Sequence, residues 1–189
     1  MNLPKTPVPV IYEDNHLLVV EKPANILSQG DQSGDRDLLT MLKEDLKRRY
    51  NKPGNVFLGL VHRLDRPVGG VMVFAKTSKA ASRLSDAIRR GDFQKTYLAA
   101  VYGKPEKTEA TLVHYVVKDH DHNKVRCVPP DFPGAKKAVL GYELLNTKNN
   151  LSLLRIRLHT GRPHQIRVQL AAIGCPLYGD QKYGGGRAK

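Results

Sequence analysis

The order of strand-like and helix-like segments is the feature that most restricts how this chain can fold. Beyond Lys95 the sequence consists mainly of strand-like runs, with a polar turn at residues 146–150 and one final helical run that stops at Gly174. The expected strands cover residues 96–102, 111–118, 137–145 and 151–158, and the expected helix covers residues 164–173. Because strands and helices are mixed without a regular strand–helix–strand alternation, the order predicts an α+β fold with a largely antiparallel sheet.

The first half of the chain contains both kinds of element. Two short strands are expected within residues 8–21, around a turn-rich break at residues 13–16. A helix is predicted from Asp37 because leucines recur there at helical spacing. Residues 71–75 predict a buried strand, and a second helix follows it. The signals of this second helix are Ser78 as N-cap, Gly91 as C-terminal stop, and an apolar face of Ala81, Leu84 and Ile88.

Length, net charge and cysteine content limit the class of protein. The length of 189 residues predicts a single domain over residues 1–189, or one domain with two lobes. The 31 Lys and Arg residues against 18 Asp and Glu give a net charge of +13, as expected of a polyanion-binding protein, although a merely basic surface is the alternative. No apolar run approaches the roughly 18 residues of a membrane span, and no signal peptide is evident. Cys127 and Cys175 are expected to be free thiols in the cytoplasm, with a disulfide as the alternative.

A lone carboxylate, Asp65, lies between arginines in the run His62-Arg63-Leu64-Asp65-Arg66-Pro67-Val68-Gly69-Gly70. The run leads directly into the strand expected at residues 71–75. Neighbouring positive charge favours the ionised carboxylate. The Pro-Val-Gly-Gly bend lets the backbone approach a ligand closely, because glycine has no Cβ. We therefore expect a nucleophile in this run, with an ordinary surface ion pair as the alternative.

Two further segments concentrate residues that neither a core nor a plain surface requires. One is the strand that begins near Lys95 and contains Tyr97, and the other is the run Thr160-Gly161-Arg162-Pro163-His164-Gln165-Ile166-Arg167. On a helix, His164 and Arg167 lie on one face, so Arg167 can face a cleft while apolar neighbours pack on the sheet. Taken singly, the tyrosine also fits a core position and the histidines also fit structural roles.

The patterns of several other enzyme classes are absent from the sequence. There is no second carboxylate at the spacing of a glycosidase pair and no glycine-rich phosphate loop. Neither a Ser-His-Asp order nor a His-Glu-x-x-His pattern occurs, so no metal site is expected.

Taken together, these segments resemble the three signature motifs of the RluA-type pseudouridine synthases. The matching segments are residues 62–65 with the glycine pair and residues 71–76, the strand of Lys95 and Tyr97, and residues 160–167. Residues 12–23 and 174–184 also resemble that family, so the likeness covers nearly the whole chain. The chain departs from the family at Val68 and Gly69, where many members carry Thr-Ser, and at Gln169, where histidine is common.

The resemblance implies an α+β catalytic domain with a mixed, mostly antiparallel central sheet, flanked by helices and crossed by the active-site cleft. It implies an isomerase that converts uridine in structured RNA, either rRNA or tRNA, to pseudouridine without a cofactor or a metal. Asp65 would be the essential carboxylate, Tyr97 would stack on the base and take the proton from its carbon five, and Arg167 would pair with Asp65. The residues expected to contact RNA are His62, Arg63, Arg66, Lys95, Arg162 and His164.

The chain begins almost at once with the catalytic pattern, so the form of the family without an S4-like module is expected. The sequence also ends soon after Tyr183, so a shortened C-terminal end is expected. We expect a cytoplasmic monomer whose partner is RNA. The alternative from another class is a catalytically silent RNA-binding relative, and the presence of Asp65, Tyr97 and Arg167 argues against it.

Overall fold

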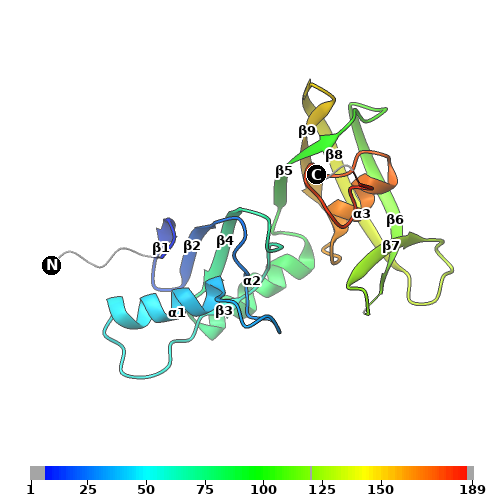
Figure 1. Cartoon of the computed structure of the whole chain (residues 1–189). Coiled ribbons are helices and arrows are strands. Elements are labelled where there is room, and N and C mark those ends of the chain that lie inside the picture. Colours follow the sequence, from blue (N-terminus) through cyan, green and yellow to red (C-terminus); the bar gives the residue numbers. More distant parts are fainter. Residues whose placement is uncertain (1–6, 120, 187–189) are drawn as a thin grey trace. The chain divides into compact units, whose positions relative to one another are not determined.

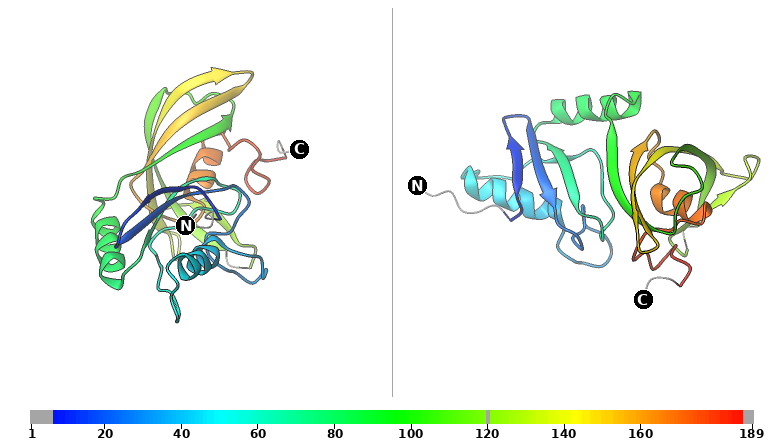
Figure 2. Two further views of the ribbon diagram at one scale, coloured as in Figure 1. Left: turned by 90° about the vertical axis from the view of Figure 1, so that its left-hand side faces the viewer. Right: turned by 90° about the horizontal axis from the view of Figure 1, so that it is seen from above.

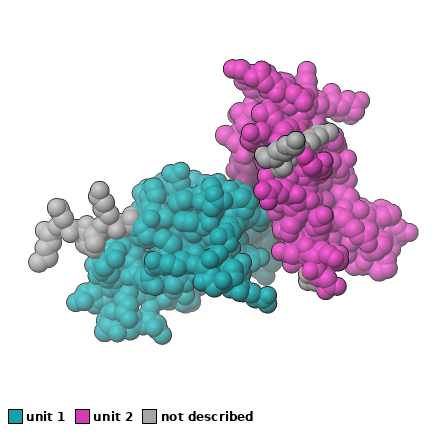
Figure 3. Space-filling model, in the orientation of Figure 1, with its two compact units in different colours: residues 1–93 teal, residues 94–189 magenta. Residues whose placement is uncertain are grey.

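The structure is a computed structural model that describes residues 7–119 and 121–186 of the chain (Figure 1). The chain divides into two compact units, Met1–Phe93 and Gln94–Lys189, here named unit 1 and unit 2 (Figure 3). Each unit contains its own antiparallel sheet and its own apolar core.

Unit 1 is built on a four-stranded sheet. Strand β2 (Leu17–Lys22) pairs with β1 (Val10–Glu13) and with β4 (Gly70–Ala75), and β4 also pairs with β3 (Gly59–Leu60). All three pairings are antiparallel. Between β2 and β4 the register places Lys22 opposite Gly70. The end of β2 therefore lies beside the point where the loop of Asp65 enters the sheet.

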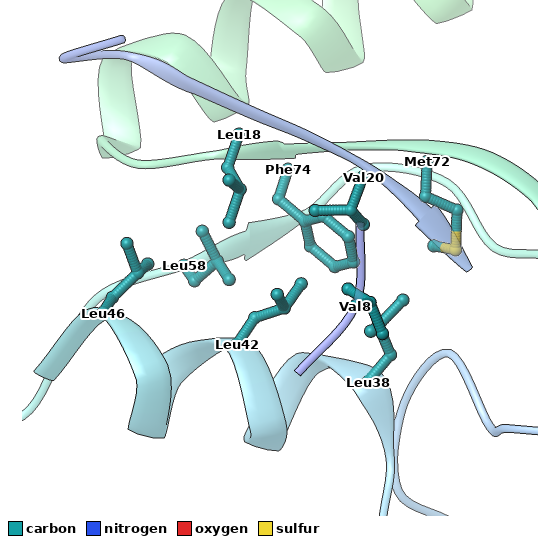
Figure 4. Packing of buried hydrophobic residues seen from close by; sticks show 9 residues of the cluster. All are labelled: Val8, Leu18, Val20, Leu38, Leu42, Leu46, Leu58, Met72 and Phe74. Atoms are coloured by element: carbon teal, nitrogen blue, oxygen red, sulfur yellow. The ribbon is translucent and has the colours of Figure 1, made fainter. Parts of the chain in front are cut away.

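Helix α1 (Leu38–Arg49) packs on one face of this sheet and contributes three leucines to the core (Figure 4). Figure 4 shows these leucines pointing toward the side chains of β2 and β4. Burial of one large apolar side chain stabilises a fold by about 1.5–3 kcal/mol, so this cluster is the main stabilising contribution in unit 1. Its members are Val8, Leu18, Val20, Leu38, Leu42, Leu46, Leu58, Met72 and Phe74.

The predicted start of each helix in unit 1 differs from the structure by one residue. Asp37 caps α1 by accepting a hydrogen bond from the N–H of Thr40 at 3.0 Å. The predicted cap of α2 (Ser78–Arg90) is wrong by one residue, because the Thr77 side chain accepts from the N–H of Ala80. Two adjacent hydroxyl residues both fit a cap, and the sequence alone does not distinguish them. Gly91 ends α2 as predicted, with a left-handed φ of 83°.

An ion-pair network joins the C-terminal end of α1 to the sheet. The Glu13 carboxylate accepts hydrogen bonds from Arg49 at 2.9 Å, Lys76 at 2.8 Å and the Tyr50 hydroxyl at 2.8 Å. Arg49 also donates to Asp45, and the Asp45 side chain is only 1% exposed. Burial alone would raise the pKa of Glu13, but the hydrogen bonds from Lys76, Tyr50 and Arg49 hold it below its ordinary value.

Unit 2 contains a five-stranded sheet in the order β5-β9-β8-β6-β7, with every pairing antiparallel. The sheet curves around helix α3, as the right-hand view of Figure 2 shows. Leu170 of α3 belongs to the core cluster that also contains Val101 and Ile156. The elements of unit 2 are β5 (Lys95–Tyr102), β6 (Glu109–Asp119), β7 (Lys124–Val128), β8 (Lys136–Lys148), β9 (Leu151–Leu158) and α3 (Gln165–Ala172).

The α+β class is confirmed, but the strands form two sheets rather than one central sheet. Strands β3 and β7 were not predicted. Val71 was expected to be buried and is 60% exposed, because it faces away from the cluster that holds Met72 and Phe74. Cys127 and Cys175 are free thiols, as predicted. The single domain over residues 1–189 stays a prediction.

None of the helices in the described part of the chain is long and apolar enough to cross a membrane.

We expect Glu13→Gln to lower the free energy of unfolding by about 1–3 kcal/mol at neutral pH, because it takes the charged partner from Arg49 and Lys76. The folded pKa of Glu13 is lowered, so its stabilising effect is complete above the ordinary value of 4.5 and disappears as the pH falls through the folded value. Urea unfolding of both proteins across this range measures the difference, which should shrink toward acid pH.

Glu44→Gln is the matched control for this experiment, because Glu44 of α1 forms an exposed ion pair with Arg36. Its removal should change the free energy of unfolding by less than about 1 kcal/mol. Equal losses from the two variants, or a loss independent of pH, would contradict the proposed contribution of the Glu13 network.

Candidate functional site

The backbone just before Asp65 is fixed by a buried serine. Ser28 donates its hydroxyl hydrogen to the Leu64 carbonyl at 2.7 Å and accepts the Leu64 N–H at 3.1 Å. Ser28 is only 4% exposed. Asp65 then begins a turn in which the N–H of Val68 donates to the Asp65 carbonyl at 3.0 Å. The side chain of Asp65 is therefore carried on a short loop whose backbone has little freedom.

The backbone just after Asp65 is fixed by a buried lysine. Lys22, at the end of β2, has no exposed surface. Its ammonium donates to the carbonyls of Pro23 at 2.9 Å and Arg66 at 3.2 Å. Burial lowers the pKa of Lys22 below its ordinary value, while the negative charge of Asp65 acts in the opposite direction. A buried cation thus lies behind the loop in addition to the flanking arginines.

The glycine pair of this loop approaches the chain's own backbone. A Cβ on Gly69 would lie 3.3 Å from the Lys22 carbonyl oxygen and 3.5 Å from the Ala24 nitrogen. Gly70 has a φ of 142°, which residues with side chains rarely adopt. Glycine is therefore required here for packing against the end of β2, and the close approach to a ligand stays a prediction.

The flanking arginines are on the surface of unit 1. Arg63, Asp65 and Arg66 are all exposed. Arg66 donates to the carboxylate of Asp35 at 2.7 Å, and both of these side chains are about half exposed. An exposed pair of this kind contributes little to stability, so Arg66 can change its partner at small cost. The contacts of Arg63 and Arg66 with RNA stay predictions.

His62 is tied to the sheet by its side chain. Its Nε2 accepts the N–H of Val73 in β4 at 3.1 Å, and its ring packs against Phe93 at a centroid distance of 5.8 Å. This geometry favours a structural role for His62 in shaping the loop. Its contact with RNA stays a prediction.

Tyr97 and Lys95 lie on β5 in unit 2. Tyr97 pairs with Ile156 of β9 and is half-buried against the core cluster of this unit. Lys95 is the first residue of β5, and its ammonium lies 3.7 Å from where a Cβ on Gly161 would be. Lys95 therefore lies next to the loop that precedes α3.

That loop is organised by Gln165, the buried first residue of α3. Its side-chain oxygen accepts from the Thr160 hydroxyl at 2.8 Å and from the Arg162 N–H at 2.9 Å, and its nitrogen donates to the Val139 carbonyl at 3.0 Å. The Arg162 guanidinium donates to the carbonyl of Lys137 at 2.9 Å. One buried amide thus connects the loop to β8.

His164 precedes α3 and is not part of it, so the helix predicted from residue 164 begins one residue later, at Gln165. His164 is the N-cap position and has a left-handed backbone with a φ of 49°. Before His164, Pro163 has a restricted φ, and after it the Gln165 side chain accepts the N–H of Arg162. The Nδ1 atom of His164 lies 2.8 Å from the Tyr183 hydroxyl.

Arg167 is held by a second carboxylate that the sequence analysis did not single out. Its Nε and Nη2 atoms donate to the two oxygens of Asp180, each at 2.7 Å. Burial alone would raise the pKa of Asp180, but the hydrogen bonds from Arg167 and from the backbone N–H of Tyr183 lower it below its ordinary value. Asp180 is therefore ionised at neutral pH.

The predicted site residues divide between the two units. Unit 1 carries the Asp65 loop, and unit 2 carries Tyr97 and Arg167. The joint action of these three residues, and the contacts of Lys95, Arg162 and His164 with RNA, stay predictions. Among residues 7–119 and 121–186, no group of three or more His, Cys, Asp or Glu side chains is placed to hold a metal ion.

A family profile and curated relatives all match this chain to RNA pseudouridine synthases. The family profile described as RNA pseudouridylate synthase matches residues 16–172. The uncharacterized RNA pseudouridine synthase YhcT of Bacillus subtilis is 36% identical over 180 residues, and the ribosomal large subunit pseudouridine synthase C of Rickettsia bellii is 33% identical over 177 residues. These alignments cover 94% and 93% of this chain but only 58% and 56% of the relatives, so the chain spans little more than half of their length.

Two solved human structures are similar in fold. The structure of human RNA pseudouridylate synthase domain containing 4 matches with a TM-score of 0.79 and 26% identity, over 93% of this chain and 68% of that one. Human RNA pseudouridylate synthase domain containing 1 matches with a TM-score of 0.76 over 97% of this chain and 72% of that one. At 22% identity, the second match concerns the fold alone.

We expect Ser28→Ala to lower the free energy of unfolding by about 1–3 kcal/mol, because both peptide groups of Leu64 lose this buried partner. The loop should also open more often, so the amides of Leu64 and Asp65 should exchange with solvent faster. Urea unfolding and hydrogen exchange measure the two effects. Ser85→Ala, at an exposed position of α2, is the control and should shift stability by no more than about 0.5 kcal/mol. Unchanged exchange in the loop would show that Ser28 does not hold it.

Proposed function

This chain belongs to the RNA pseudouridylate synthase family, and from that premise we propose that it isomerises uridine in RNA to pseudouridine. In this reaction the bond between N1 of the base and C1′ of the sugar breaks, the base turns, and C5 bonds to C1′. The proton of C5 is removed and N1 gains one, so no co-reactant is consumed. The proposal rests on Asp65, an exposed carboxylate on a loop whose flanking peptide groups are held by Ser28 and Lys22.

Asp65 is the proposed essential carboxylate. A carboxylate nucleophile must be ionised and must be held in a fixed place. The buried ammonium of Lys22 contributes positive charge behind the loop, and the hydrogen bonds at Leu64 and Arg66 restrict the backbone. This fixed position of the loop is compatible with attack by Asp65 on C1′ of the sugar. It is equally compatible with attack on the uracil ring.

Tyr97 and Arg167 are the other proposed catalytic residues. We propose that the Tyr97 ring, half-buried at the edge of the unit 2 core, stacks on the base and that its oxygen removes the proton from C5. Arg167 would pair with the carboxylate of Asp65 and keep it ionised. Arginine suits this role because its guanidinium is always charged and binds a carboxylate through two parallel hydrogen bonds.

RNA binding in this proposal combines base flipping with contacts to phosphates. The target uridine must leave its stack, which costs a few kcal/mol. Arg63, which is exposed beside Asp65, would enter the gap that the base leaves. The net charge of +13 favours phosphate binding. The proposed contacts are His62, Arg66, Lys95, Arg162 and His164.

The proposed substrate is ribosomal RNA, with a tRNA arm as the second candidate. Relatives from Rickettsia bellii and Buchnera aphidicola are named ribosomal large subunit pseudouridine synthases C and D, which favours the ribosomal substrate. We propose further that the protein acts in the cytoplasm as a monomer and uses neither a metal nor a cofactor.

We expect Asp65→Asn to abolish pseudouridine formation while RNA binding is largely kept, because the amide is isosteric but cannot act as a nucleophile. Pseudouridines are mapped by carbodiimide adducts and primer stops in RNA from cells that lack the gene and carry either wild-type protein or a variant. A site restored by the wild type and not by Asp65→Asn identifies the substrate. Asp92→Asn is the matched control, because Asp92 is likewise an exposed carboxylate of unit 1, and the change removes only its surface pair with Arg90.

Two outcomes of the mapping would contradict this proposal. Full activity of Asp65→Asn would exclude the proposed role of the carboxylate. Absence of any lost site in cells that lack the gene would favour the catalytically silent RNA-binding relative.

We expect RNA affinity to fall steeply with salt, because each phosphate contact releases counterions. Four contacts would weaken binding by about 100-fold between 50 and 200 mM salt. Filter binding of Asp65→Asn to total RNA measures this slope without turnover. Arg162→Gln should reduce the slope of log affinity against log salt concentration by roughly the contribution of one phosphate contact. An affinity independent of salt would contradict phosphate binding.

A further inference from the structure

Asp180 holds the side chain of Arg167 in a fixed orientation. The two hydrogen bonds between them are parallel, and both are 2.7 Å long. The Arg167 side chain is 18% exposed and the Asp180 side chain 3% exposed. A two-pronged bond of this kind fixes both the position and the plane of the guanidinium.

The carboxylate of Asp180 is itself fixed by the turn that follows it. Its Oδ1 accepts from the backbone N–H of Lys182 at 2.9 Å and of Tyr183 at 3.1 Å. The Asp180 carbonyl accepts from the N–H of Gly184 at 2.8 Å. The turn thus places Asp180 without help from Arg167, so the carboxylate can act as the fixed partner of the pair.

Tyr183 connects this pair to the rest of unit 2. The guanidinium carbon of Arg167 lies 4.9 Å from the centre of the Tyr183 ring. The Tyr183 hydroxyl accepts the N–H of Val125 in β7 at 2.8 Å and lies 2.8 Å from Nδ1 of His164. The turn, β7 and the start of α3 therefore meet at one aromatic residue that also covers one face of the guanidinium.

Stability alone is a weak reason for this arrangement. Desolvation of two charges usually offsets their mutual attraction, so a buried ion pair adds little net stability compared with apolar packing. Arg167 is on a helix whose other inward residues, such as Val168 and Leu170, already pack in the core. The cost of a buried ion pair here is better explained by a need for a guanidinium in one orientation.

We propose that Asp180 is a positioning residue for the reaction, which holds the Arg167 guanidinium in the orientation that its catalytic role requires. This inference rests on the proposed function, because the role of Arg167 does. Asp180 acts through Arg167 and Tyr183 and touches neither the base nor the sugar. Arg167 then needs no reorientation when RNA binds, which lowers the barrier to the reaction.

The test compares Asp180→Asn with the wild type on total RNA from cells that lack the gene. We expect the rate of pseudouridine formation at saturating enzyme to fall by about 100-fold, as for a catalytic group misplaced by about 1 Å. The enzyme concentration that gives half of this rate should change little.

Three variants separate positioning from a merely structural role. Glu143→Gln is the matched control, because it removes an exposed arginine pair of unit 2, Arg155 with Glu143 at 2.8 Å, and should leave the rate unchanged. In an Arg167→Lys background, Asp180→Asn should cause no further loss of rate. Asp180→Glu keeps the charge but displaces it by one methylene group, so the rate should stay low while the fold is kept.

The position of the guanidinium can also be measured without turnover. The Nε–H of Arg167 should give a slowly exchanging nuclear magnetic resonance signal that Asp180→Asn removes. An unchanged signal and rate in Asp180→Asn, or a full rate in Asp180→Glu, would overturn the proposal. If wild-type protein forms no pseudouridine, the proposed function fails, whereas loss of the Nε–H signal would still establish that Asp180 positions Arg167.

Discussion

The requirement that buried polar groups be hydrogen-bonded determines the shape of both functional loops. The Asp65 loop is held by the buried side chains of Ser28 and Lys22, and the loop before α3 is held by the buried amide of Gln165. An unpaired buried donor or acceptor costs about 1–3 kcal/mol, so each of these side chains strongly favours one loop conformation. The apolar cores supply the stability, and a few polar side chains beneath the loops determine where the functional residues are.

Buried charge lies beneath the Asp65 loop and in the turn that follows α3, as it also does in α1 at Asp45. Lys22 is fully buried and Asp180 nearly so, whereas the ion pairs of Arg36 with Glu44 and of Arg90 with Asp92 are exposed. An exposed pair contributes little and is easily lost or gained. A buried charge must be matched by specific partners, so each of these charges restricts the positions of the groups that surround it.

The sequence predicted the local elements well and the long-range contacts poorly. Apolar periodicity identified α1 and most strands, because it depends on which side of an element is buried. It missed β7, because Lys124–Val128 is short and follows the polar segment after Asp119. It missed the division into two sheets, which depends on strand pairing. The local sequence singled out Asp65, Tyr97 and Arg167, and a family resemblance supplied their expected roles. Ser28 lacks any local signal and acts on a residue 36 positions away.

Gln169, where the chain departs from the family pattern, contacts the sheet of unit 2 through its side-chain amide. It is fully buried on α3, and its side-chain nitrogen lies within hydrogen-bond distance of the carbonyls of Leu112 and Ala138 and of Nδ1 of His114 at 3.0 Å. Burial lowers the pKa of His114, so its ring is neutral and can accept from the amide. The amide nitrogen thus supplies a buried donor toward β6 and β8, whereas the amide oxygen is buried without a hydrogen-bond partner among the described residues. The glutamine therefore provides a polar contact that holds α3 against the sheet, at the cost of one unpaired buried oxygen.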